Sequence, residues 1–146
     1  MKTMKKLTSA AFAVAILGMS TVTANAACTS TAGYWANHAW CTQTISIGGQ
    51  TYTRDQAIDI INNSTSGDKT YSLAAQLIGA KLNTDCGGAD STCVELAIAA
   101  ADAWLILHPV GSGIPSKSPA WKQINSAYNT LTDYNEGRLC VPKCRS

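Results

Sequence analysis

Residues 69–82 read KTYSLAAQLIGAKL, and their apolar pattern determines the class of fold. The segment follows Asp68, a residue type that commonly begins a helix. Its residues recur three and four positions apart on two neighbouring stripes: Leu73, Leu77 and either Ala80 or Lys81 on one, and Ala74, Ile78 and Leu82 on the other. Such a wide apolar face is typical of a helix in the core of a globular domain. The sequence therefore predicts a core helix from residue 69 to about residue 82.

Two further helices are predicted by capping boxes, in which two side chains three residues apart satisfy free backbone amides at the helix start. Thr53 and Gln56 form the first pair, before a helix over residues 54–62. Thr92 and Glu95 form the second, before a helix with one inward face: Val94, Ala97, Ile98, Ala101, Trp104 and Leu105. Each helix therefore has a start signal and an apolar side.

A proline separates the third predicted helix from a fourth. Pro109 ends the third, because the residue before a proline avoids the helical conformation. After a loop rich in Gly, Pro and Ser, Ser118 and Pro119 are a favourable start for the fourth helix. Gly137 is the predicted C-cap.

A short hairpin precedes the helices. Residues 44–47 (TISI) and 50–52 (QTY) are rich in β-forming residues, and the pair Gly48-Gly49 separates them. Two glycines between such runs favour a tight hairpin turn. We therefore expect an all-α domain, a small bundle of about four helices with an N-terminal aromatic segment and a short hairpin, stapled by disulfides.

Length and composition indicate one globular domain, and the net charge bears on which partners it can bind. It has 146 residues, of which 46% are hydrophobic and 14% charged. Its 11 basic and 9 acidic residues become 8 and 9 without residues 1–26, a net charge of −1. Such a nearly neutral chain offers no electrostatic basis for binding nucleic acid.

Residues 1–26 resemble a bacterial secretory signal peptide. Lys2, Lys5 and Lys6 precede an apolar run over residues 7–19, and Ala24-Asn25-Ala26 is a small-x-small cleavage pattern. The apolar run is too short to be a transmembrane helix. We therefore predict a mature domain over residues 27–146, secreted or held at the cell surface, with the periplasm as the alternative.

Cysteine usage agrees with export. Six cysteines follow the cleavage pattern: Cys28, Cys41, Cys86, Cys93, Cys140 and Cys144. An even number in an oxidising compartment predicts three disulfides. Zinc binding is less favoured, because no Cys-x2-Cys pair exists.

The positions of the six cysteines along the sequence favour some disulfide pairings but do not determine all three. Cys86 and Cys93 flank a tight GGADST loop, and we expect them to pair locally. The other four cysteines form either two local loops or two bridges that tie the chain ends together. We favour the second arrangement, because a longer closed loop removes more entropy from the unfolded chain.

No catalytic, metal or cofactor signature is present in the sequence. Gly111-Ser112-Gly113 lacks the Gly-x-Ser-x-Gly spacing of a nucleophile elbow. His38 and His108 are the two histidines, and we expect each to hydrogen-bond a loop carbonyl rather than bind a metal. Asp55 and Asp59 share a helix face but have no facing partner carboxylates. We expect no cofactor and no enzymatic activity.

The aromatic segment holds the candidate ligand-binding residues: Tyr34, Trp35, Asn37, His38 and Trp40. Exposed aromatic rings can stack on sugars or form a hydrophobic contact surface. The competing interpretation, which we favour, is that Trp35 and Trp40 close the open end of the bundle.

Several of these segments together resemble an uncharacterised family of exported bacterial proteins with a GFWKNH or GYWKNH segment. The matching residues lie in GYWANH (33–38), LAAQLIGAKLN (73–83), PVGSG (109–113) and YN-x-G (134–137). The resemblance implies a stand-alone secreted protein or a module of larger surface proteins, without an established activity. This chain has Ala36 where lysine is usual.

We therefore expect an exported, non-enzymatic structural, adhesive or self-assembling module of the cell surface or extracellular matrix. Its partner would be a second copy or a surface or matrix component, including a glycan. The alternatives are a carbohydrate-binding module with an aromatic platform and a hydrolase of unrecognised type.

Overall fold

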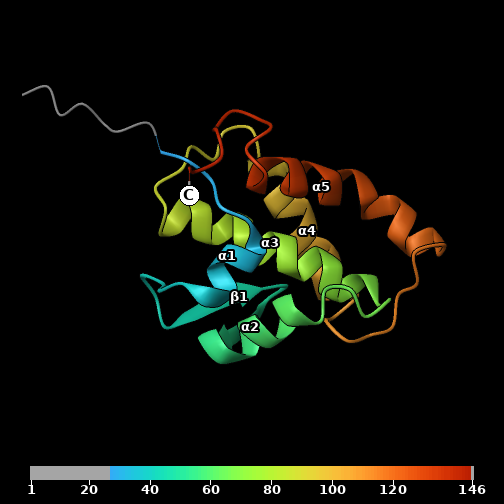
Figure 1. Cartoon of the computed structure of the whole chain (residues 1–146). Coiled ribbons are helices and arrows are strands. Elements are labelled where there is room, and N and C mark those ends of the chain that lie inside the picture. Colours follow the sequence, from blue (N-terminus) through green and yellow to red (C-terminus); the bar gives the residue numbers. More distant parts are fainter. Residues whose placement is uncertain (1–26, 146) are drawn as a thin grey trace, which may run out of the picture.

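The computed structural model describes residues 27–145, and the predicted signal peptide, residues 1–26, lies outside them. Within the described range the chain forms a helical bundle with one hairpin (Figure 1). Its elements are α1 (Ala32–Asn37), β1 (Thr44–Ile47), β2 (Gln50–Thr53), α2 (Arg54–Asn62), α3 (Lys69–Asp85), α4 (Glu95–Leu107) and α5 (Pro119–Asn135). The predicted helical class with a hairpin is thus confirmed in outline, with one helix more than expected.

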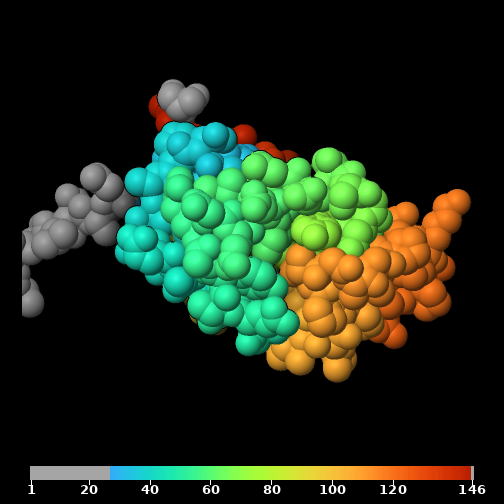
Figure 2. Space-filling view, turned by 90° about the horizontal axis from the view of Figure 1, so that it is seen from below, coloured from blue at the N-terminus to red at the C-terminus, as the bar shows by residue number. Residues whose placement is uncertain are grey.

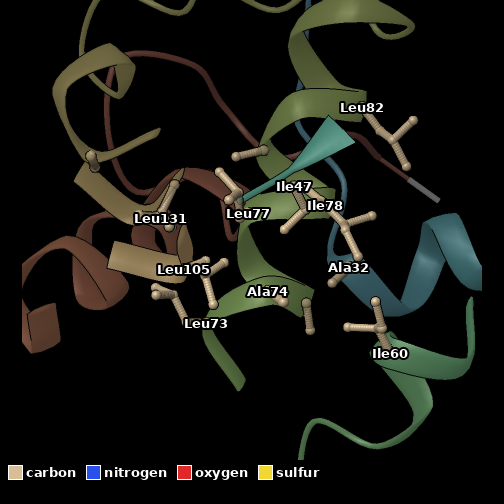
Figure 3. Packing of buried hydrophobic residues seen from close by; sticks show 14 of the residues in the cluster. Ala32, Ile47, Ile60, Leu73, Ala74, Leu77, Ile78, Leu82, Leu105 and Leu131 are labelled. Carbon is tan, nitrogen blue, oxygen red and sulfur yellow. The ribbon is translucent and has the colours of Figure 1, made fainter. Parts of the chain in front are cut away.

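Helix α3 is the centre of the molecule, because α1, α2, α4, α5 and β1 all contact it. Its predicted apolar face is buried, and Figure 3 shows Leu73, Leu77 and Ile78 gathered between neighbouring elements. Ile47 of β1 and Leu131 of α5 lie in the same cluster. Each such side chain stabilises the fold by roughly 1.5–3 kcal/mol when it is fully buried.

Local start and stop signals form as predicted at α2 and α5. Thr53 Oγ1 accepts from the Gln56 amide at 3.3 Å, and Gln56 Oε1 accepts from the Thr53 amide at 2.9 Å. Ser118 Oγ accepts from the Trp121 amide at 3.1 Å. Gly137, at φ 72°, ends α5 in the left-handed region that favours glycine.

The predicted capping box at Thr92 is wrong. Helix α4 begins at Glu95 after Val94, which makes no side-chain cap. The Thr92 amide donates instead to Asp90 Oδ1 at 2.9 Å, which holds Thr92 in a turn before the helix. Glu95 Oε1 accepts from Ser91 Oγ at 2.8 Å rather than from a residue at position 92.

The aromatic segment is more regular than the sequence indicates, because its residues form α1. Thr31 is the N-cap, and its Oγ1 accepts from the Tyr34 amide at 3.2 Å. A helix of six residues is too short to show an apolar period. This helix is the one beyond the four that we expected.

The hairpin forms around the predicted Gly48-Gly49 turn, and its second strand extends one residue further than expected, to Thr53. Strands β1 and β2 pair antiparallel from Thr44 with Thr53 to Ile47 with Gln50. Gly48 and Gly49 have φ of 56° and 74°, as a tight hairpin turn requires. A Cβ at Gly48 would lie 2.7 Å from Cβ of Leu105, so the turn rests directly on α4.

Three disulfides join segments that are distant in sequence: Cys28–Cys144, Cys41–Cys86 and Cys93–Cys140. The expected local bridge between Cys86 and Cys93 is therefore wrong. The loop after α3 is closed instead by the Ala89 amide, which donates to the Asn83 carbonyl at 2.9 Å, and both cysteines are left for distant partners. Three disulfides indicate an oxidising compartment.

The expected tie between the chain ends is present in one bridge. Cys28–Cys144 spans 116 residues, and the two flanking segments run side by side (Figure 1). The Thr29 amide donates to the Pro142 carbonyl at 2.9 Å, and the Cys144 amide donates to the Thr29 carbonyl at 2.8 Å. We call these two segments, residues 27–31 and 141–145, the terminal strap.

Candidate functional site

Trp35 is a core residue and not part of an exposed platform. Helix α1 turns its ring inward, where 7% of the residue remains exposed. Its Nε1 donates to Asn83 Oδ1 of α3 at 3.1 Å. A buried tryptophan needs such a partner for its N–H, so α3 supplies the reason for its orientation.

Asn83 is the junction of this part of the molecule. Its Oδ1 also accepts from the Ser30 amide at 2.8 Å, and its Nδ2 donates to the Ser30 carbonyl at 2.8 Å and to Asn135 Oδ1 at 3.0 Å. Asn135 Nδ2 in turn donates to Gln76 Oε1 at 2.9 Å. The network joins the terminal strap, α1, α3 and α5, which is a structural role.

Trp40 is half-buried and also held in place. Its Nε1 donates to the Trp35 carbonyl at 2.8 Å. The guanidinium of Arg54 lies 5.8 Å from the Trp40 ring and donates to the His38 carbonyl at 3.2 Å. The indole N–H and one face of the Trp40 ring are therefore already engaged within the protein, by the Trp35 carbonyl and by the Arg54 guanidinium.

Tyr34 and His38 are the exposed part of the predicted site. Their rings stack at 3.6 Å between centroids, and Tyr34 is 41% exposed. His38 Nδ1 donates to the Tyr34 carbonyl at 2.7 Å, which fixes the proton on Nδ1 because a carbonyl only accepts. Asn37 Nδ2 is used within the helix, where it donates to the Gly33 carbonyl at 3.1 Å.

A shallow hollow of about 260 Å³ lies beside Tyr34. The terminal strap forms most of its wall, with Thr29, Ser30, Lys143 and Arg145. Lys143 Nζ pairs with Glu136 at 3.4 Å, so part of the positive charge here is already balanced. Thr29 and Ser30 are buried, so the exposed groups around the hollow are the two cations and the Tyr34 ring, and no carboxylate or imidazole lines it.

The residues weighed for catalysis or metal binding are dispersed. His108 stacks on Trp104 at 4.2 Å between centroids, and its Nδ1 donates to the Trp104 carbonyl at 3.1 Å. Among residues 27–145 no three His, Cys, Asp or Glu side chains gather as metal ligands would. Both histidines thus bond carbonyls of helix residues four positions earlier, and the loop carbonyls that we predicted as their partners are wrong.

The Gly111-Ser112-Gly113 loop is held by Asp68 and has no nucleophile arrangement. Asp68 accepts from the amides of Gly113 at 3.0 Å and Ile114 at 3.1 Å, and from Thr70. Figure 2 shows this loop, in orange, against the beginning of α3, in green. Partial burial opposes the carboxylate charge, but these hydrogen bonds outweigh it and hold the pKa of Asp68 below its ordinary value.

A surface that we did not anticipate lies on α4. Leu96, Ile106 and Leu107 are 88%, 59% and 77% exposed, although α4 is one of the central helices. Alanines fill the exposed positions between them. We call this surface the α4 outer face and define it by Leu96, Ala99, Ala100, Ala103, Ile106 and Leu107.

The sequence carried a signal for this face. Residues 95–107 read ELAIAAADAWLIL, so apolar residues lie on every side of the helix and Glu95 and Asp102 are its only charges. Asp102 is engaged elsewhere, because it accepts from the Gly48 amide at 2.9 Å and pairs with Lys81. A helix that is apolar all round is expected to be covered on all sides. Here α3 and α5 cover one side (Figure 1).

Length and apolar content exclude a membrane-crossing role for each helix in the described range. No protein-family model matches the chain, and neither a curated protein nor a solved structure matches it.

Proposed function

We propose that the protein is an exported, non-enzymatic module that acts by protein–protein association at the cell surface or in the extracellular matrix. The observation that carries this proposal is the α4 outer face. Monomeric proteins seldom expose a contiguous apolar patch of this kind without using it for an interaction. The resemblance to exported bacterial proteins remains a prediction that agrees with this function.

The energetics favour a covered face. Burying a Leu or Ile side chain stabilises by roughly 1.5–3 kcal/mol, and three such side chains stand in water on α4. The six residues carry no charge, and Asp102 beside them is already paired. Association would therefore remove apolar surface from water without stranding a charge.

The burial of most of the aromatic segment supports a structural role for this part of the molecule. Trp35, Asn83 and Asn135 bond to one another or to neighbouring segments and are buried. Three disulfides fasten this end of the bundle. A rigid, stapled body that presents one apolar helix face suits adhesion or assembly outside the cell.

The test uses the oxidised chain purified after export. Light scattering over a wide concentration range should show particles heavier than one chain, and labelled protein should bind bacterial cells or isolated matrix. A chain that is monomeric at every concentration and binds neither cells nor matrix would contradict the proposal.

A second candidate function is glycan binding, favoured by the exposed Tyr34–His38 stack beside the hollow at the terminal strap. A sugar ring would lie on Tyr34, and Lys143 and Arg145 would favour acidic sugars. A glycan array with wild type and Tyr34→Ala tests this, with tryptophan fluorescence as a check of folding. Equal binding by both proteins, or none by either, removes this candidate.

A further inference from the structure

The disulfide Cys93–Cys140 differs from the other two bridges in the surroundings of its two sulfurs. We propose that it is a thiol-exchange site, at which an external thiolate attacks Sγ of Cys140 and Cys93 leaves as a thiolate. The exchange attaches a thiol-bearing molecule covalently to Cys140. This inference concerns the chemistry of the single chain and does not depend on the proposed association.

Exposure determines which of the two sulfurs an incoming thiol reaches. Cys140 is exposed in the turn that follows α5, whereas Cys93 is half-buried and packs against the hydrophobic core. Thiol–disulfide exchange requires the attacking thiolate to reach the sulfur with which it bonds. Attack is therefore directed to Cys140, and Cys93 becomes the leaving group.

The surroundings of Cys93 stabilise the negative charge that it acquires on leaving. Its Sγ accepts from the Cys140 amide at 3.3 Å. Cys93 also lies two residues before the first residue of α4, at the positive end of the helix dipole. A positive helix end stabilises a thiolate, and the sulfur with the more stable thiolate leaves faster.

Two carboxylates lie close to Cys93 in the sequence, and both accept hydrogen bonds. Asp90 Oδ1 accepts from the Thr92 amide at 2.9 Å, and Glu95 Oε1 accepts from Ser91 Oγ at 2.8 Å. Their charges oppose a thiolate at Cys93, and these donors reduce that opposition. Glu95 is thus a side chain whose charge can be removed to test the site.

The bridge Cys41–Cys86 provides an internal comparison. Cys41 is exposed and its amide donates to Cys86 Sγ at 3.2 Å, so its outer cysteine and its hydrogen bond match those of Cys93–Cys140. The inner sulfur differs, because Cys86 is the C-cap of α3, at the negative end of a helix dipole. A thiolate on Cys86 is therefore less stable than one on Cys93, and this bridge opens more slowly.

The bridge Cys28–Cys144 is protected by the terminal strap. Both of its cysteines are half-buried. The Thr29 amide donates to the Pro142 carbonyl at 2.9 Å, and the Cys144 amide donates to the Thr29 carbonyl at 2.8 Å. These hydrogen bonds keep the two cysteines side by side after the bridge opens, so that it closes again and little mixed disulfide accumulates.

The exchange is balanced without an oxidant or a reductant. One S–S bond forms between the incoming sulfur and Cys140, and the Cys93–Cys140 bond breaks with its electron pair on Sγ of Cys93. The fold keeps its other ties, because α4 still packs on α5 and the Tyr134 hydroxyl still donates to the Asp90 carbonyl at 2.9 Å. Attack of Cys93 on the mixed disulfide restores the original bridge.

The experiment uses the exported, oxidised chain and reduced glutathione as the probe thiol. Glutathione is added in small excess, samples are quenched with iodoacetamide at increasing times, and peptide mass mapping identifies each cysteine. Glutathione should appear on Cys140 and the alkyl group on Cys93. This bridge should open about two- to fivefold faster than Cys41–Cys86, the range that a helix-end charge produces.

A charge variant tests the electrostatic basis. Glu95→Gln keeps an acceptor for Ser91 Oγ but removes the negative charge beside Cys93, so opening of Cys93–Cys140 should accelerate by about twofold. The other two bridges should open at the wild-type rate. Asp59→Asn, on the exposed surface of α2, is the matched control and should leave all three rates unchanged. Circular dichroism verifies that both variants keep the helical fold.

Each result has a defined meaning. Glutathione on Cys140 with Cys41–Cys86 and Cys28–Cys144 still closed supports the site. Glutathione on Cys93, equal rates at the three bridges, or earlier opening of either other bridge overturns the inference. An unchanged rate in Glu95→Gln overturns the electrostatic assignment of Cys93 as the leaving group.

Discussion

Asn83 shows how one residue organises this molecule. It is 1% exposed, and its side-chain amide bonds both the amide and the carbonyl of Ser30, the indole of Trp35 and the amide oxygen of Asn135. Buried polar groups are costly unless they are satisfied, and here each partner is satisfied by the same side chain. The placement of α1 and of the terminal strap therefore depends on this amide.

Replacing Asn83 by alanine should destabilise the protein by roughly 2–4 kcal/mol, because the Ser30 amide and the Trp35 indole would lose their partner while buried. Urea denaturation followed by far-UV circular dichroism measures the free energy of unfolding. The control is Asn62→Ala on the exposed surface of α2. Equal stability of the two variants would show that the network contributes nothing.

Gly79 is a second residue whose role is set by its neighbours. A Cβ at this position would lie 2.9 Å from Asn135 Nδ2 and 3.2 Å from Cα of Ala32. Gly79→Ala should therefore destabilise by roughly 1–3 kcal/mol through overpacking, despite the better helix propensity of alanine.

Gly33→Ala is the matched control, because Gly33 also lies in a helix and its nearest contact would be at 3.9 Å. That substitution should stabilise by up to roughly 1 kcal/mol. Thermal melts of both variants measure the two effects. A gain in stability for Gly79→Ala would show that α1 and α5 do not approach α3 as closely as described.

At the scale of elements, most of the local signals in the sequence were informative. The Thr53–Gln56 capping box, the Ser118–Pro119 start and the Gly48-Gly49 turn all formed as predicted. The start of α4 was mispredicted because the predicted capping box required the Thr92 amide to donate to Glu95. That amide donates instead to Asp90, two residues earlier.

The candidate site was less predictable because its chemistry depends on distant partners. Trp35 is buried because Asn83, 48 positions away, accepts its N–H. The cysteine pairing has the same origin, since each bridge joins segments that only the tertiary fold brings together. Apolar residues on every side of α4 were visible in the sequence, but only the packing shows which side is left uncovered.

The hydrogen bonds between Asp68 and the loop after α4 predict how the stability of the fold depends on pH. The pKa of Asp68 is lowered in the folded chain, so the unfolded chain takes up a proton there at higher pH, near the ordinary value of about 3.9. The stabilisation by this carboxylate is therefore complete above that value and is lost as the pH falls through the lower folded pKa.

Asp68→Asn keeps an N-cap oxygen but removes the charge. It should lower stability by about 1 kcal/mol near neutral pH, and the difference from wild type should shrink below pH 4. Urea denaturation from pH 2 to pH 7 measures both curves, with Asp59→Asn as the surface control. Parallel stability curves for wild type and Asp68→Asn over the whole pH range would show that the Asp68 carboxylate does not stabilise the fold through a lowered pKa.

At the scale of the whole molecule, the two ends of the bundle are held by different means. The three disulfides, the terminal strap and Asn83 all lie at the end where α3 finishes and α4 begins. The opposite end is held by hydrogen bonds, with Asp68 bound to Gly113 and Ile114. Covalent fastening is thus confined to one end of the bundle, whereas hydrogen bonds hold both ends.

Reduction should therefore loosen one end first. Hydrogen exchange under a thiol reductant should rise in residues 27–31 and 138–145 before it rises in α3 or in residues 109–114. The double variant Cys28→Ser with Cys144→Ser should lose about 2–4 kcal/mol, in line with the entropy of a long closed loop. Complete loss of helical circular dichroism on reduction at room temperature would show instead that the core itself depends on the bridges.

The Cys28–Cys144 bridge also determines how the module carries tension. A pull applied at Ala27 and Arg145 passes from one cysteine directly to the other, so the 116-residue span between them bears almost no load. An oxidised module in a surface-attached chain would act as a short, inextensible link whose α4 outer face keeps its shape under shear. Opening that single bridge would shift the same force onto the helical core.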